Sequence, residues 1–83
     1  MEIKVLGPGC ANCKRLEAIV REVVAEMGAA AAIEKVTDFK EIVSYGILAT
    51  PGLVIDGEVK SAGRIPAKAE ITSWVASALA RAQ

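Results

Sequence analysis

Polar and apolar side chains alternate at the start of the chain. Residues 2–6 follow this period-two pattern and include Ile and Val, which predicts a β-strand. After a Gly-Pro-Gly break at residues 7–9, apolar side chains recur every three or four positions, which predicts an amphipathic helix. The apolar stripe of this helix is Leu16, Ile19, Val20, Val23, Val24 and Met27. Gly28 follows as a natural C-terminal stop, so the chain is expected to open with one strand and one long helix.

The middle of the chain predicts a second strand and a short helix. Residues 31–36 favour the strand, although alanine is a weak strand former. Asp38 followed by Glu41 matches the capping arrangement of a helix that ends near Ser44. The apolar residues that we expect this helix to bury are Phe39, Ile42 and Val43.

The last part of the chain predicts a hairpin and a terminal helix. Residues 53–55 and 59–62 favour strands, and Asp56-Gly57 between them supplies the positive φ angles of a two-residue turn. Pro66 suits the first position of a helix, where its missing N–H is tolerated. The inner stripe of this helix is expected to be Ile71, Trp74, Val75, Ala78 and Leu79.

The order of these elements, βαβαββα, predicts an α/β fold. A right-handed crossover makes the first two strands parallel, and the hairpin adds an antiparallel pair. We therefore expect three layers, in which three helices flank the two faces of a four-stranded mixed sheet. Because a chain of 83 residues has no room for a second core, residues 1–83 are expected to form a single domain.

Charge and composition narrow the classes of function. Ten basic and ten acidic side chains leave no net charge, which argues against nucleic-acid binding. Aromatic residues make up only 4% of the chain, so no platform for stacking bases is visible. The N-terminus does not resemble a signal peptide, and every apolar run falls short of the roughly 18 residues that a membrane span needs. We therefore expect a soluble cytoplasmic protein that binds neither nucleic acid nor membrane.

The chemistry that the sequence suggests lies in its two cysteines. In a reducing compartment they are poor candidates for a structural disulfide, and so small a loop would remove little chain entropy. Cys10-Ala11-Asn12-Cys13 lies where the first strand meets the long helix. Unpaired amides and the positive end of the helix dipole stabilise a thiolate there. We therefore expect the pKa of the Cys10 thiol to lie below that of a free thiol, about 8.5.

This placement predicts thiol–disulfide exchange in two steps. Cys10 is the nucleophile, which attacks a disulfide of the partner and forms a mixed disulfide. Cys13 is the resolving thiol, because residues three apart on a helix have Cβ atoms about 5–6 Å apart and a small rotation can join them. Its attack on Cys10 releases the reduced partner, and the same steps in reverse oxidise a dithiol.

A cysteine pair with two intervening residues, set between the first strand and the first helix, resembles thioredoxins. The second half of the chain adds residues that are similar to theirs in type and spacing, namely Tyr45, Gly46, Ile47, Pro51, Leu53, Gly57 and Glu58. The shortness of the chain and the run at residues 7–14 look most like the minimal bacterial and archaeal thioredoxin-like proteins. The resemblance implies a cis Thr50–Pro51 peptide that faces the cysteines, with both residues binding substrate.

The resemblance also implies the partners of the protein. These would be protein disulfides or dithiols, and a reductase or another electron donor. The protein would act as a monomer in electron transport and cell redox homeostasis, and we expect neither a cofactor nor a metal site.

Three departures from ordinary thioredoxins leave alternatives open. Gly9 replaces the aromatic residue that usually precedes the first cysteine, Ala11-Asn12 replaces Gly-Pro, and no buried carboxylate is evident to take the proton from Cys13. A module that binds or transfers a metal with the two thiolates is the first alternative, although closed zinc sites use about four ligands and the chain has no histidine. A non-enzymatic adaptor with a thioredoxin fold is the second.

Overall fold

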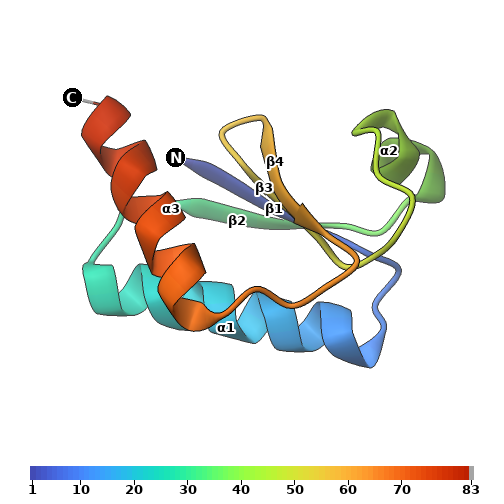
Figure 1. The fold of residues 1–83 in the computed structure, drawn as a ribbon, viewed down its shortest axis with the longest axis horizontal. Coiled ribbons are helices and arrows are strands. Elements are labelled where there is room, and N and C mark those ends of the chain that lie inside the picture. The colour runs from blue at the N-terminus through green and yellow to red at the C-terminus, as the bar shows by residue number, and fades with distance from the viewer. Residues whose placement is uncertain (83) are drawn as a thin grey trace.

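Strands and helices follow one another in the predicted order (Figure 1). The computed structural model describes residues 1–82. Its elements are β1 (Glu2–Leu6), α1 (Ala11–Met27), β2 (Ala32–Val36), α2 (Phe39–Ser44), β3 (Gly52–Ile55), β4 (Glu58–Ala62) and α3 (Lys68–Arg81). As expected, α1 ends at Gly28, which has a positive φ of 61°.

The strands of residues 1–82 form one mixed sheet in the order β2-β1-β3-β4. β1 pairs in parallel with β2 and antiparallel with β3, and β4 is antiparallel to β3 at the edge. The hairpin turns at Asp56 and Gly57, whose φ angles of 47° and 81° suit the predicted two-residue turn. The predicted α/β fold, with a four-stranded mixed sheet and three helices, is confirmed.

The central strand β1 contributes to the cores on both faces of the sheet, because its side chains alternate. Ile3 and Val5 belong to the larger core, which α1 and α3 share, and Leu6 belongs to the smaller core next to α2. Figure 1 shows α1 running along one side of the sheet, with α2 on the other side. The larger core consists of Ile3, Val5, Leu16, Val20, Val23, Leu53, Ile55, Ile71, Val75 and Ala78. The smaller core consists of Leu6, Val36, Ile42, Ile47 and Val54.

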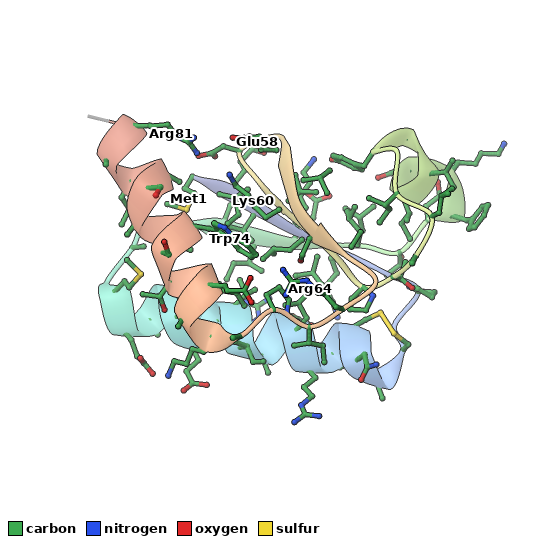
Figure 2. All side chains as sticks on the ribbon, in the orientation of Figure 1. Met1, Glu58, Lys60, Arg64, Trp74 and Arg81 are labelled. Carbon is green, nitrogen blue, oxygen red and sulfur yellow. A yellow bond between two sulfur atoms is a disulfide. The ribbon has the colours of Figure 1, made fainter. Side chains whose placement is uncertain are left out.

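Exposed ion pairs link α3 to α1 and to β4. The Lys68 ammonium lies 2.6 Å from a Glu22 oxygen and 2.7 Å from a Glu26 oxygen, which joins α3 to α1. The hydrogen bond from Lys68 lowers the pKa of Glu22 and, in turn, the pKa of Lys68 is raised. Arg81 of α3 forms an ion pair with Glu58 of β4, with 3.5 Å between the charged atoms. Figure 2 shows the two side chains pointing toward each other. Within residues 1–82, no helix is both long and apolar enough to cross a membrane.

Two expectations for the helices were wrong. Phe39 and Val43 are 76% and 45% exposed, and only Ile42 of α2 is buried. A helix of six residues makes fewer than two turns, so it presents only a narrow stripe to the sheet.

The start of α3 is the second correction. Pro66 is buried but precedes the N-cap residue Ala67, so it is not the first helical residue. The Glu70 carboxylate accepts a hydrogen bond from the N–H of Ala67 at 3.1 Å, so Ala67 is the N-cap and the helix begins at Lys68.

The packing of α1 onto the sheet can be tested at Leu16, which is fully buried one turn after Cys13. We expect Leu16→Ala to lower the free energy of unfolding by about 2–5 kcal/mol, because it leaves a cavity in the larger core. The neighbouring exposed residue provides the control, and Arg15→Ala should change the value by less than about 0.5 kcal/mol. Denaturant titration measures both. Equal losses in the two variants would contradict the packing described.

Candidate active site

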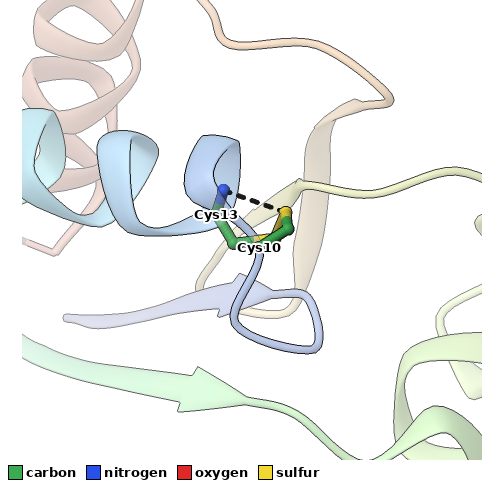
Figure 3. Close-up of a disulfide and its surroundings, with 2 residues drawn as sticks. All are labelled: Cys10 and Cys13. Carbon is green, nitrogen blue, oxygen red and sulfur yellow. Dashed lines mark hydrogen bonds between the residues drawn. A yellow bond between two sulfur atoms is a disulfide. The ribbon is translucent and has the colours of Figure 1, made fainter.

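The two cysteines lie at the first turn of α1. Cys10 is the N-cap residue, with extended backbone angles, and Cys13 is the third residue of the helix. Their Cα atoms are 5.0 Å apart and their sulfur atoms form a disulfide (Figure 3). The spacing of two residues therefore places the thiols where they can join, as the sequence predicts.

Exposure distinguishes the two cysteines. Cys10 is exposed at the surface, whereas Cys13 is only 5% exposed. The difference arises because the cap residue stands outside the helix, while the side chain of Cys13 packs beneath the end of β1. A partner can therefore approach the sulfur of Cys10 much more readily than that of Cys13.

The start of the helix also favours negative charge on the exposed sulfur. The backbone N–H of Cys13 donates a hydrogen bond to the Cys10 sulfur at 3.2 Å, shown as the dashed line in Figure 3. The first turn of α1 contains no acidic residue that would oppose the helix dipole. The same amide and dipole would stabilise a Cys10 thiolate after reduction of the disulfide.

The peptide bond between Thr50 and Pro51 is cis, as the resemblance implies. Thr50 is exposed and Pro51 is buried. The carbonyl of Pro51 accepts a hydrogen bond from the N–H of Gly63 at 2.9 Å, which links this loop to the end of β4.

Gly7 joins the cysteine loop to the Thr50 loop. It is buried, and a Cβ atom built on it would overlap the sulfur of Cys13 and lie 3.8 Å from the Cβ of Thr50. The four residues expected in the site thus gather around the end of β1. Sequence analysis interpreted Gly7 only as part of the break between the first strand and the first helix. A glycine at a strand end can also mark a place where another part of the chain comes close to the backbone.

The chain is similar to known proteins over most of its length. Residues 1–76 match the family model described as "Thioredoxin domain". The thioredoxin of Methanothermobacter thermautotrophicus is 46% identical over 71 residues, which cover 86% of this chain and 92% of that protein. The thioredoxin of Methanocaldococcus jannaschii is 36% identical over 77 residues, which cover 93% of this chain and 88% of that protein. The chain belongs to the thioredoxin family.

Membership of this family, together with the Cys10–Cys13 disulfide, identifies the protein as a thiol–disulfide oxidoreductase. The resemblance to small archaeal thioredoxin-like proteins is confirmed. The metal-transfer and adaptor alternatives are not favoured. Within residues 1–82, no three side chains of His, Cys, Asp or Glu gather as a metal site would need.

A thiol must lose its proton before it attacks a disulfide, and sequence analysis found no buried carboxylate near Cys13. Cys13 lines a cavity of about 60 Å³, and Glu17 and Lys35 line the same cavity. The side chain of Glu17 is 16% exposed, and its carboxylate lies 3.0 Å from the Arg21 guanidinium and 3.9 Å from the Lys35 ammonium. Glu17 follows Cys13 by four residues on α1, and this helical spacing could have indicated that the two side chains are neighbours.

The close approach at Gly7 predicts a stability effect that depends on the sulfur of Cys13. Gly7→Ala should destabilise the reduced protein by about 1–3 kcal/mol, because the added methyl overlaps that sulfur. In a Cys13→Ala background the same substitution should cost less than half as much, since the overlapping atom is gone. Denaturant titration of the four proteins gives the coupling. An equal cost in both backgrounds would show that Gly7 is constrained by something else.

Proposed function

We propose that Cys10 is the nucleophile and Cys13 the resolving thiol in the reduction of protein disulfides. The observation that carries this assignment is the difference in exposure, since Cys10 is exposed and Cys13 is 5% exposed. The hydrogen bond from the Cys13 amide to the Cys10 sulfur supports it, because this bond stabilises the thiolate that attacks.

The exchange conserves electrons and protons. The Cys10 thiolate attacks one sulfur of a partner disulfide, so a bond forms to Cys10 and the other partner sulfur leaves as a thiolate that takes up a proton. Cys13 then loses its proton and attacks Cys10. The mixed disulfide breaks, the second partner sulfur leaves, and Cys10–Cys13 is oxidised while the partner is reduced by two electrons.

Thr50 and Pro51 are proposed to bind the substrate beside Cys10. Thr50 is exposed and lies close to Gly7, next to the buried sulfur of Cys13. The Pro51 carbonyl is already engaged by Gly63, which holds the loop in place. An extended partner segment would therefore lie against Thr50, with Pro51 as the fixed support.

We also propose the wider setting of the reaction. A separate reductase or another electron donor would restore the dithiol, and the protein would act as a monomer in cytoplasmic electron transport and redox homeostasis. Cytoplasmic action is consistent with the use of the cysteine pair for exchange. A disulfide that closes so small a loop adds little stability.

A trapping experiment tests the roles of the two cysteines. Cys13→Ser should accumulate mixed disulfides between Cys10 and a disulfide-bonded protein such as insulin, because the resolving step is missing. Cys10→Ser should trap little, since the remaining thiol is buried. Non-reducing gels followed by mass spectrometry measure the adducts, and Cys10→Ser/Cys13→Ser is the blank. Equal trapping by the two single variants would refute the assigned roles.

A further inference from the structure

The charged side chains of α1 run against the dipole of the helix. A helix favours acidic residues near its start and basic residues near its end, because its backbone dipole is positive at the start. In α1 the first turn contains no acidic residue and the last turn contains no basic one. Lys14 and Arg15 lie just after the first turn, whereas Glu22 and Glu26 lie toward the end. Neither end of this helix therefore gains stability from its own charges.

The rest of the protein compensates this arrangement at one end of α1 only. Glu22 and Glu26 share the ammonium of Lys68, at 2.6 Å and 2.7 Å. Lys14 and Arg15 are both exposed, and within residues 1–82 neither of them forms an ion pair. The negative charge that would balance these two cations has to come from outside the chain.

Glu17 is the acidic residue of α1 nearest to Lys14 in sequence, and it does not neutralise Lys14. Both residues line the cavity next to Cys13. The Glu17 carboxylate, however, lies 3.0 Å from the guanidinium of Arg21 and 3.9 Å from the ammonium of Lys35. Two cations already share this one carboxylate. The surface at the start of α1 therefore keeps an excess of positive charge, although the net charge of the whole chain is zero.

Lys14 lies one helical turn from the exposed Cys10. Its backbone N–H donates a hydrogen bond to the carbonyl of Cys10 at 3.0 Å, and residues four apart share one face of a helix. Side chains on a helix lean toward its start, which directs Lys14 toward the disulfide. Lys14 accordingly lines the same cavity as Gly9 and Cys13. A partner whose sulfur reaches Cys10 would bring its neighbouring residues within reach of the Lys14 ammonium.

We propose that Lys14, with Arg15 on the same turn, binds an acidic side chain that flanks the reactive cysteine of a partner protein. The preferred substrates are protein disulfides next to Asp or Glu. Disulfides next to Lys or Arg are disfavoured, because the same two cations repel them. The attraction acts between exposed groups, so it is modest and weakens as salt is added. The inference rests on the proposed function, because it concerns the substrate of the Cys10–Cys13 pair.

The test compares disulfide substrates that differ in the charge beside the cysteine. The reduced protein is mixed with peptide dimers in which each cysteine is followed by Asp, by its neutral isostere Asn, or by Lys. Quenching by alkylation gives the second-order rate constant for each peptide. The ratio of the Asp constant to the Asn constant reports the interaction, because a change in the reactivity of the thiol cancels in it.

We expect Lys14→Gln to lower this ratio about threefold and Lys14→Gln/Arg15→Gln to lower it about fivefold. The ratio of the Lys constant to the Asn constant should rise in both variants, and added salt should reduce the differences. Lys14→Arg keeps the charge and should keep the wild-type ratios. Arg81→Gln is the matched control, because it removes one exposed cation at the end of α3, away from the start of α1 (Figure 1). It should change neither ratio.

Each contrary outcome decides against the proposal. An unchanged ratio in Lys14→Gln would overturn it, and so would an equal fall in Arg81→Gln, because net charge alone would then explain the effect. A lower midpoint of denaturant unfolding in Lys14→Gln/Arg15→Gln would contradict it as well, since the two cations would then have partners within the protein. Failure of the proposed function is distinct, because the wild type would then exchange with none of the peptide disulfides.

Discussion

The backbone N–H of Cys13 donates to the sulfur of Cys10 at the point where β1 ends and α1 begins. Helices usually satisfy such an amide with the oxygen of a capping Ser, Thr, Asp or Asn. Here a cysteine occupies the N-cap position, so the sulfur that caps the start of the helix is also the reactive group. Cys10 is exposed because a cap residue lies outside the helix. Cys13 is buried because it lies one turn further into the helix.

This arrangement depends on how firmly α1 is held against the sheet. Leu16, Val20 and Val23 are fully or almost fully buried in the larger core, and Lys68 ties the far half of the helix to α3. At the near end, Gly7 lets the chain pass the sulfur of Cys13 without a side chain between them. A chain of 83 residues buries proportionately little surface, and β1 contributes side chains to both of its cores.

The spacing of apolar residues and the residues typical of turns were sufficient to predict most of the fold from sequence. Alternation indicated β1, the three- and four-residue spacing indicated α1, and Asp56-Gly57 indicated the hairpin. What could not be predicted depends on neighbours that are distant in sequence. The pattern shows that Phe39 is apolar, but not that α2 is too short to bring it to the sheet.

The site divides in the same way. Residues three apart at the start of a helix lie within reach of each other, so the Cys10–Cys13 disulfide was predictable from their spacing. The resemblance to thioredoxins placed Thr50 opposite the cysteines, but no local pattern indicates its close approach to Gly7, because the two residues are more than forty positions apart. Lys35 faces Glu17 from another element, which no local pattern of charges indicates.

A redox titration of the purified, metal-free protein tests the central claim most directly. The protein is equilibrated at a series of potentials, its free thiols are alkylated, and the mass reports how many were free. The account predicts a single two-electron transition between about −300 and −120 mV, from a Cys10–Cys13 disulfide to two thiols. The absence of an intramolecular disulfide at every potential would contradict the account.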